Sequence, residues 1–484
     1  MRRPLVLDRS EVAQVLEDST TGLARKAPLL SASRTFSGRQ VAAAGGVLAA
    51  VVAVAVAWPI PTAVAGVTVA TVLYLANLAD RLWLFSNGLG GSPAVRVSPA
   101  DARAIPDDEL PVYTVLVPAF KEPNVVAQLL AGLGQIEYPA DKLDVKLLLE
   151  ADDTETVSAV EQTIDDIELP VEVLAVPPSE PRTKPKACNF GLHYADGELV
   201  TIYDAEDVPD PLQLRRAVAA FRRLPPDVAC IQARLSYHNL RQNLLTGWFA
   251  SEYDQWFGFT LPGLMKTRSP IPLGGTSNHL HTALLRQLGG WDPFNVTEDA
   301  DLGIRLARAG YRTAVLDSVT LEEANSDPIN WLRQRSRWYK GYLQTFLVHT
   351  RELGTLRREL GWRGLVRMCS VTAGTPVVAV INVVFWALAI AWELGEPTLI
   401  REIFPSFVFY PAMVSLVLGN ASMMYCGLVA ARVDGKVRLL LPCLTVPVYW
   451  VLMSAAAVKA MVQLIFQPSY WEKTVHGLDS RPRA

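Results

Sequence analysis

The residues of this chain best suited to chemistry form two acidic clusters and one basic-aromatic pentapeptide. The clusters are DAED at 204–207 and TED at 297–299, and the pentapeptide at 334–338 reads QRSRW. An acidic pair after an apolar strand can hold a divalent cation on a diphosphate, and a later carboxylate can act as a base. The Arg-Trp end can supply charge for a leaving group and an aromatic face for stacking. Together, in this order, the three motifs indicate sugar transfer.

The first cluster has the spacing of a metal site. Asp204 and Glu206 stand at alternate positions just after a predicted strand at 199–203. Both carboxylates can therefore approach one hard cation, and Mg²⁺ or Mn²⁺ would keep its remaining positions for phosphate oxygens and water. A structural salt bridge is the alternative interpretation.

The second cluster, Thr297, Glu298 and Asp299, begins a predicted helix with a buried apolar face. A helix N-cap followed by acidic first-turn residues would explain the same sequence. Both interpretations can hold, because a capping site also fixes a catalytic base in place.

Three further segments carry polar side chains that we expect near the same site. One follows a predicted strand at 145–149, one is a basic loop at 184–189, and one is a glycine turn at 272–279. Helix capping, a surface basic patch and a plain structural turn are the respective alternatives. The candidate residues are Glu150, Asp152, Lys186, Asn189, Asn278 and His279.

The elements that must position these residues follow an α/β pattern. Short apolar strands are predicted at 112–117, 145–149, 171–176 and 199–203, with helical segments between them. This alternation is typical of a parallel α/β sheet. Ligands of such sheets bind beyond the carboxyl ends of the strands, which is where the acidic groups fall.

Four apolar runs without any charged residue predict membrane spans. They cover residues 41–58, 60–79, 370–392 and 404–431, and each can cross a hydrocarbon core of about 30 Å. The loop at 393–402 is net acidic, whereas the segment after the fourth run is mostly basic. The positive-inside rule then places the polar middle of the chain in the cytoplasm of a multi-pass plasma-membrane protein.

A fifth apolar stretch, Leu439 to Phe466, is harder to interpret. Pro442 and Pro447 interrupt the pattern, and Lys459 lies in its second half. A single crossing would put the C-terminus outside. Prolines and a snorkelling lysine favour a re-entrant, interfacial or doubly crossing segment that keeps the C-terminus inside.

Composition excludes several other classes. A net charge of -3 over 484 residues argues against a nucleic-acid partner. The five cysteines contain no CxxC pair, so neither disulfides nor a cysteine metal site is expected. Residues 1–40 mix both charges with apolar positions and could form a helix that packs on the catalytic domain or on an accessory envelope partner.

From these motifs, the chain resembles the membrane-embedded family 2 glycosyltransferases, in the group of processive polysaccharide synthases that includes cellulose and hyaluronan synthases. The resemblance covers residues 111–477. Four family elements occur in order: an aspartate after an early strand, a DxD motif, a TED motif and QxxRW. They correspond to Asp152, to Asp204 with Glu206, to 297–299, and to Gln334, Arg337 and Trp338. Glu206 departs from the second aspartate of DxD, and its longer side chain makes the metal geometry differ.

This resemblance implies a GT-A α/β domain at 95–345, joined to an α-helical transmembrane bundle. The N-terminal segment 1–40 would precede two transmembrane helices at 41–85. Amphipathic interface helices would occupy 346–369, with transmembrane or interface helices at 370–466. The tail at 467–484 loosely resembles a gating loop, in which Thr474 and His476 would reach the nucleotide diphosphate from the cytoplasm.

The resemblance also implies a reaction. Asp299 would be the base, within the catalytic motif of Thr297 and Glu298, in one inverting displacement on a nucleotide sugar. The most favoured donor is UDP-glucose or another UDP-hexose. The product is a β-linked polysaccharide that is translocated across the membrane, where the protein also contacts membrane lipids. Nucleotide-sugar contacts are expected from Glu150, Asp152, Lys186, Asn189, Asp204, Gln334 and Arg337.

The growing polysaccharide acceptor would stack on Trp338 and contact Asn278 and His279. One alternative is a single transfer onto a polyprenyl phosphate or another lipid acceptor. An alternative of another class is a non-catalytic membrane scaffold or transporter.

Overall fold

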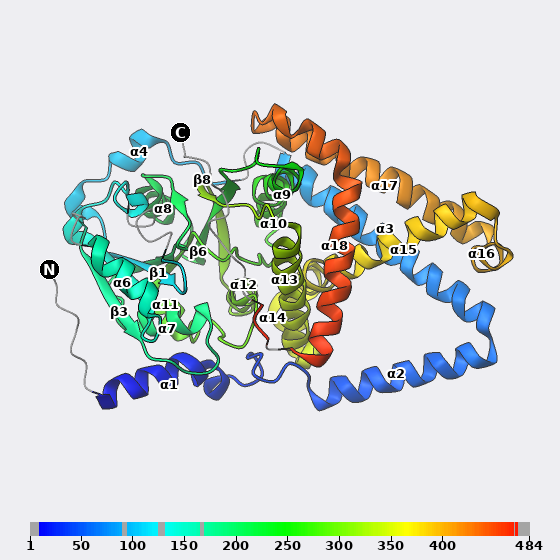
Figure 1. Cartoon of the computed structure of the whole chain (residues 1–484), viewed down its shortest axis with the longest axis horizontal. Coiled ribbons are helices and arrows are strands. Elements are labelled where there is room, and N and C mark those ends of the chain that lie inside the picture. Colours follow the sequence, from blue (N-terminus) through cyan, green and yellow to red (C-terminus); the bar gives the residue numbers. More distant parts are fainter. Residues whose placement is uncertain (1–8, 90–93, 124–130, 165–168, 469, 473–484) are drawn as a thin grey trace.

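A computed structural model describes residues 9–89, 94–123, 131–164, 169–468 and 470–472. An α/β domain lies at one end of the molecule, and four long helices extend away from it (Figure 1). These helices are α2 (Gly38–Ala57), α3 (Pro59–Leu89), α15 (Thr375–Gly395) and α17 (Ser406–Val433).

The domain is built on one mixed, mostly parallel sheet of eight strands in the order β3-β2-β1-β4-β7-β6-β8-β5. β1 pairs in parallel with β2 and β4, and β2 with β3, whereas β7 runs antiparallel to both of its neighbours. The four strands predicted from the sequence and the α/β fold class are confirmed. The strands are β1 (Tyr113–Ala119), β2 (Leu143–Glu150), β3 (Val171–Val176), β4 (Leu199–Ile202), β5 (Val208–Pro209), β6 (Val228–Tyr237), β7 (Asn278–His281) and β8 (Arg312–Glu322).

Helices cover both faces of the sheet, because successive residues of its central strands point to opposite sides. Val115 and Val117 of β1 belong to a core with α6 and α8, while Leu116 between them belongs to a second core with α7 and α12. The covering helices are α6 (Thr154–Thr163), α7 (Lys184–His193), α8 (Gln213–Arg223), α10 (Leu261–Lys266), α11 (Thr282–Gln287) and α12 (Glu298–Arg308).

The N-terminal segment also packs on the domain. Helix α1 (Arg9–Lys26) lies against α7, and its Val15 is buried in the second core. Two further helices, α13 (Pro328–His349) and α14 (Leu353–Cys369), join the domain to the long apolar ones. Helix α9 (Leu244–Gln255) packs against α17.

Five helical stretches of the described residues are long and apolar enough to cross a membrane, and one of them ends with α18 (Leu440–Phe466). Helix α18 runs without a break through Pro442 and Pro447, so the prolines noted in the sequence do not end the helix. Pro442 falls in the first helical turn, where the missing N–H has no intrahelical acceptor.

Helix α18 stands beside α13, across the direction of the four extended helices (Figure 1). Ala456, Ala457 and Ala460 pack on Tyr339 of α13. Beyond its C-terminal end, the Tyr470 carbonyl accepts a hydrogen bond from Lys340 Nζ at 2.5 Å. Just before its N-terminal end, Lys436 Nζ forms an ion pair with Asp254 Oδ1 of α9 at 2.5 Å. Both ends of α18 therefore contact the α/β domain, and its non-crossing topology stays a prediction.

The backbone of helix α3 lies in direct contact with the backbone of the α/β domain. A Cβ atom at Gly88 would lie 2.2 Å from the Phe259 carbonyl oxygen, and one at Gly263 of α10 would lie 2.2 Å from the Leu84 carbonyl oxygen. Only glycine fits at these two positions. The pair of glycines thus sets how the second long helix docks on the domain.

We therefore expect Gly263→Ala to destabilise the protein by about 1–3 kcal/mol, because one added methyl group forces two backbones apart. Thermal unfolding of the purified protein in detergent measures this. Gly66→Ala on α3 is the matched control, since nothing lies within 4 Å of a Cβ at that position. Equal unfolding temperatures for the two variants would contradict this account of the docking.

Candidate active site

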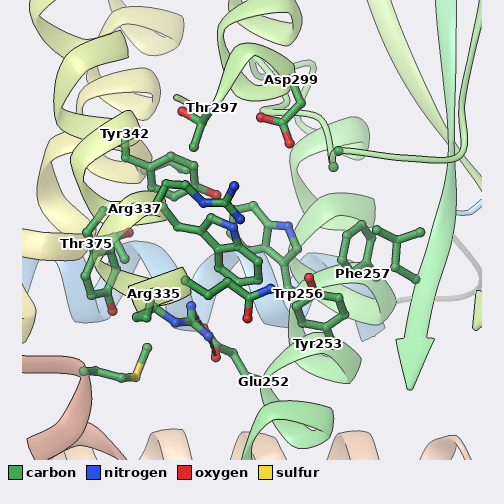
Figure 2. Close-up of a pocket in the computed structure, with 18 of the residues that line it drawn as sticks. Glu252, Tyr253, Trp256, Phe257, Thr297, Asp299, Arg335, Arg337, Tyr342 and Thr375 are labelled. Atoms are coloured by element: carbon green, nitrogen blue, oxygen red, sulfur yellow. Dashed lines mark hydrogen bonds and ion pairs between the residues drawn. The ribbon is translucent and has the colours of Figure 1, made fainter. Parts of the chain in front are cut away.

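A cavity of about 650 Å³ runs from the carboxyl ends of β1, β2 and β4 to the long apolar helices. It brings all three sequence motifs together, although 130 residues of chain separate Asp204 from Gln334. Figure 2 shows Asp299 and Arg337 facing this space from different helices. Ten residues of the motifs line it: Asp204, Ala205, Glu206, Thr297, Glu298, Asp299, Gln334, Arg335, Arg337 and Trp338.

The TED motif stands at the start of α12, with Thr297 at its N-cap position. Asp299 Oδ1 accepts a hydrogen bond from the Ala300 amide at 2.7 Å. Helix α13 passes directly behind Thr297, since a Cβ atom at Gly341 would lie 2.4 Å from the threonine hydroxyl oxygen. That contact holds the motif against the helix that carries QRSRW.

The two carboxyl groups of this motif differ in acidity. Burial raises the pKa of Asp299 to about 6, and burial together with the charge of Asp299 raises the pKa of Glu298 to about 8. At neutral pH Asp299 is therefore the ionised member of the pair. A base is most effective when its pKa lies near the working pH, and Asp299 meets that condition.

In the other acidic cluster, the half-buried pair Asp204 and Glu206 lies next to the buried carboxyl group of Asp207. Asp207 Oδ2 accepts the Asp204 amide at 2.7 Å and the Thr276 hydroxyl. Burial, with Asp204 and Glu206 nearby, raises the pKa of Asp207 well above its usual range. Burial, followed by the negative charge of Asp207, likewise raises the pKa of Glu322 well above its usual range. The wall of the cavity thus gathers carboxyl groups whose ionisation a bound cation would favour.

The carboxylate side chains of this cavity wall are suitable ligands for a divalent cation. Among the described ranges, no three His, Cys, Asp or Glu side chains form a complete metal cage. Asp204 and Glu206 both line the cavity, and Mg²⁺ commonly binds through one or two carboxylates plus substrate phosphates and water. These two residues are the ones that would hold Mg²⁺ or Mn²⁺ beside a diphosphate.

The cation next to the acidic wall is Lys184 rather than the expected Lys186. Lys184 lines the cavity, forms an ion pair with Asp204, and donates to the Gly275 carbonyl at 2.8 Å. Lys186 is fully buried on another face of α7, where its Nζ lies 2.6 Å from Glu150 Oε1. Residues two apart on a helix point in different directions, which explains the exchange of roles.

The other side chains that were expected to contact the nucleotide sugar lie at the edge of the cavity or away from it. Glu150 borders the cavity but is paired with Lys186. Asp152 lies outside the lining and pairs with Arg182 at 2.8 Å, and Arg182 itself lines the cavity. Asn189 holds the Trp291 backbone instead, accepting from its amide at 2.9 Å.

The two expected acceptor contacts in the glycine turn are not at the cavity either. Asn278 and His279 lie in β7, between β4 and β6, and are almost completely buried. His279 Nδ1 is hydrogen-bonded to the Tyr113 hydroxyl at 2.8 Å. The turn is shorter than predicted, and of the residues at 272–279 the cavity lining includes Leu273, Gly274, Gly275 and Thr276.

The C-terminal segment reaches the site at its start. The guanidinium of Arg337 lies 4.5 Å from the centre of the Trp471 ring, and Trp471 lines the cavity. Thr474 and His476, the two residues expected to contact the diphosphate, lie outside the described residues.

An ion pair beside Trp338 was not anticipated from the sequence. Arg335 Nη1 donates to Glu252 Oε1 at 2.8 Å, and the Tyr449 hydroxyl donates to Glu252 Oε2 at 2.7 Å. The Arg335 guanidinium lies 4.7 Å from the Trp338 ring centre. Figure 2 shows Glu252 and Arg335 on the side of the cavity away from Asp299. Arg335, the first arginine of QRSRW, was a signal in the sequence, but the sequence did not show its partner Glu252 on α9.

A family described as "Glycosyltransferase like family 2" matches residues 111–341. Those residues form a family 2 glycosyltransferase domain. The match ends within α13, three residues after Trp338, so the domain contains every motif that lines the cavity.

Curated relatives of this glycosyltransferase domain include enzymes of several kinds. The probable glycosyltransferase YdaM of Bacillus subtilis is 25% identical over 52% of this chain and 60% of its own length. The beta-monoglucosyldiacylglycerol synthase of Synechocystis is 26% identical over 54% of this chain and 53% of its own length. Cellulose synthase 1 of Komagataeibacter xylinus is 26% identical over 66% of this chain but only 20% of its own length. The matched region thus spans less than two thirds of each of these relatives.

A solved structure shares the fold of the glycosyltransferase domain. It is the mannosyltransferase PcManGT from Pyrobaculum calidifontis in complex with GDP-Man and Mn²⁺. The two chains are 20% identical with a TM-score of 0.54, and the match covers 83% of this chain and 99% of the other. The likeness confirms a GT-A-like fold.

The contrast between the two lysines yields a prediction. Lys184→Met should weaken donor binding at least about tenfold, because it removes a charge-assisted contact at the place where a diphosphate would lie. Lys186→Met should instead lower thermal stability, since it leaves the buried Glu150 carboxylate without its partner. Nucleotide-sugar titration and thermal unfolding of both variants measure the two effects. Weaker donor binding in the Lys186 variant alone would contradict the assignment.

Proposed function

We propose that this chain is a membrane-embedded, inverting glycosyltransferase that moves a sugar from a nucleotide-sugar donor to an acceptor hydroxyl. The observation that carries the proposal is one cavity in a family 2 glycosyltransferase domain that joins an acidic pair, a buried carboxyl group of raised pKa and a cationic side chain. These are Asp204 with Glu206, Asp299, and Arg337.

The proposed reaction is one displacement. Asp299 accepts the proton of the acceptor hydroxyl as its oxygen attacks the anomeric carbon, and the bond from that carbon to the diphosphate oxygen breaks. Attack from the side opposite the leaving group inverts the anomeric configuration, so an α-linked donor gives a β-linked product. Lys184 and Arg337 offset the negative charge of the departing diphosphate. A divalent cation bound to Asp204 and Glu206 would add positive charge at the same place.

The far part of the cavity suits a carbohydrate acceptor. Beyond Trp338 it is lined by further aromatic rings, among them Tyr253, Trp256 and Trp450. Deeper between the long helices the lining includes three amide side chains, of which Asn382 accepts from the Tyr74 hydroxyl at 3.0 Å. Rings offer stacking faces for sugars and amides offer hydrogen bonds to hydroxyl groups. The amide residues are Asn77, Asn382 and Asn420.

From this lining we propose that the acceptor is a growing β-linked polysaccharide, extended processively from UDP-glucose or another UDP-hexose. The resemblance to cellulose synthase 1 supports this choice. The α2–α3 pair brings the chain back to the side it started from, so α1 and the glycosyltransferase domain share one side of the membrane. We place that side in the cytoplasm by the positive-inside rule.

The base assignment predicts both a variant phenotype and a pH profile. Asp299→Asn should lower the transfer rate by at least about a thousandfold while donor affinity stays within about threefold, because a base acts in the transition state. In the unchanged protein the pKa of Asp299 is raised to about 6. The carboxylate is ionised above that value and protonated below it, so the rate should fall as pH drops below 6.

Initial-rate measurements between pH 5 and 8 with labelled donor, together with nucleotide-sugar titrations, test both statements. Asp317→Asn is a suitable control, since that carboxylate lies outside the cavity lining and pairs with Arg96. Substantial transfer by the Asp299 variant, or a rate that does not change between pH 5 and 7, would remove Asp299 from the base role.

One observation favours a second candidate, a single transfer onto a lipid phosphate. Arg81 of α3 lines the cavity at its membrane end and, within the described part of the chain, forms no ion pair with a carboxylate. Its Nη2 donates to the Thr375 hydroxyl at 3.3 Å. The buried Tyr339 hydroxyl, also in the lining, has no hydrogen-bond partner there. A guanidinium and a free hydroxyl could receive a phosphate group.

Two variants separate these acceptors. Trp338→Ala should abolish polymer formation while donor hydrolysis to free sugar continues, because water does not need a stacking platform. Arg81→Met should leave polymer yield within about threefold of the unchanged protein, since a neutral sugar needs no guanidinium there. Product sizing after incubation with labelled UDP-hexoses, with and without added polyprenyl phosphate, measures both. Transfer only to the polyprenyl phosphate, lost in the Arg81 variant, would establish the second candidate instead.

A further inference from the structure

Residues 27–37, between α1 and α2, form a segment that we call the N-terminal strap. It contains only turns and no helix or strand. It lies against the loop at 291–297, which leads directly into Thr297 and the start of α12. The strap lies outside the matched family region at 111–341, and so do two residues that hold it, Gln344 of α13 and Arg351 in the turn between α13 and α14.

Three side chains connect the N-terminal segment to this loop. Gln344 Nε2 donates to the Thr35 hydroxyl at 3.2 Å and to the Phe294 carbonyl at 3.1 Å. Asp292 accepts from the Ser31 hydroxyl at 3.1 Å and from the Ala32 amide at 2.5 Å. Asn189, the third, donates to the carbonyls of Ser19 and Trp291. Gln344 and Asp292 are completely buried, so these contacts are shielded from water.

The strap is held from a second direction by Arg351. Its Nη1 donates to the carbonyls of Pro28, Leu29 and Ser31 at 3.0–3.1 Å, and its Nη2 donates to that of Arg34. One guanidinium therefore satisfies four carbonyl groups of an irregular segment. These four contacts favour the observed path of the strap over other paths.

The same network reaches the catalytic motif. Gln344 Oε1 accepts the Val296 amide at 3.1 Å. The adjacent Thr297 amide donates to Asn295 Oδ1 at 3.1 Å, and Asn295 Nδ2 donates to the Thr345 hydroxyl at 3.0 Å. The backbone just before Asp299 is thus fixed by neighbouring residues of α13, and one of them also binds the strap.

We propose that the N-terminal strap is a working part of the active site and that Gln344 is a positioning residue. The strap and Gln344 hold the loop at 291–297 so that Asp299 keeps its place relative to the acceptor hydroxyl. This inference rests on the proposed function of Asp299. Because the strap continues through Ser37, which caps α2, the position of the base is tied to the first long apolar helix.

The test uses the full-length protein and two substitutions that remove single hydrogen-bonding groups. Thr35→Val deletes the strap hydroxyl at constant shape, and Gln344→Met deletes the amide. Each should lower kcat about tenfold or more with the donor KM within about twofold, since small misplacements of a catalytic group are costly in rate. Thr35→Ser, which restores the hydroxyl, should recover most of the rate.

Hydrogen exchange of the peptide covering 291–300 gives a readout that does not depend on activity. Exchange there should become faster in Thr35→Val and Gln344→Met, and return to the original rate in Thr35→Ser. Thr21→Val is the matched control, because Thr21 is an exposed residue of α1 whose hydroxyl bonds only to the Glu17 carbonyl. It should change neither kcat nor exchange.

The possible results separate the two proposals. Unchanged exchange and unchanged kcat in both variants would overturn the strap proposal. Faster exchange with an unchanged kcat would overturn the positioning role and leave the strap as a purely structural contact. If the unchanged protein transferred no sugar from any donor, the proposed function would fall, while exchange at 291–300 would still decide whether the strap holds the loop.

Discussion

The concentration of carboxyl groups at one edge of the sheet is the constraint on which the rest of the structure depends. Carboxylates in a buried site repel one another and lose hydration, so each must be protonated, paired or neutralised by a cation. Lys184 from α7 and Arg337 from α13 supply positive charge at this acidic edge. Both helices must therefore converge on this edge. The carboxyl groups concerned are Asp204, Glu206, Asp207, Glu298, Asp299 and Glu322.

The same crowding gives the carboxyl groups different roles. Burial raises the pKa of Glu298 above that of its neighbour Asp299, so one member of the pair holds a proton at a pH where the other can accept one. Asp207 is buried below the loop and fixes it through the Asp204 amide, which leaves Asp204 and Glu206 to face the cavity. Environments that push the pKa values of adjacent acids apart are a common basis for acid and base assignments.

The glycosyltransferase domain and the long helices share this cavity and are not separate units placed side by side. Helix α13 carries the last motif of the domain on one face and packs along α18 on another. Arg335, Glu252 and Tyr449 join α13, α9 and α18 in one buried hydrogen-bonded group. Removing one partner of such a group leaves a buried charge unpaired, so these contacts hold the three helices in register. The cavity can then continue from the acidic wall to the amide side chains between α3, α15 and α17.

The sequence by itself determined four of the eight strands, the order of the motifs and the apolar helices. These are local properties, because the alternation of strands with helices, the uncharged runs and the spacing within each motif can be recognised from residues close together in the sequence. It also identified Asp204, Glu206, Asp299, Arg337 and Trp338 as residues that would meet, and the structure brings them to one cavity.

Only the tertiary structure decided which neighbours of those residues share the cavity. Lys184 and Lys186 are alike in sequence, and the packing of α7 alone buries one and exposes the other to the acidic wall. Asn278 and His279 lie in strand β7 and not in the expected turn, because β4 and β6 pair with that segment on both sides. The partners of Arg335 and Gln344 lie 83 and 309 residues away. Contacts over such separations leave no local pattern, since they depend on how whole helices and strands pack.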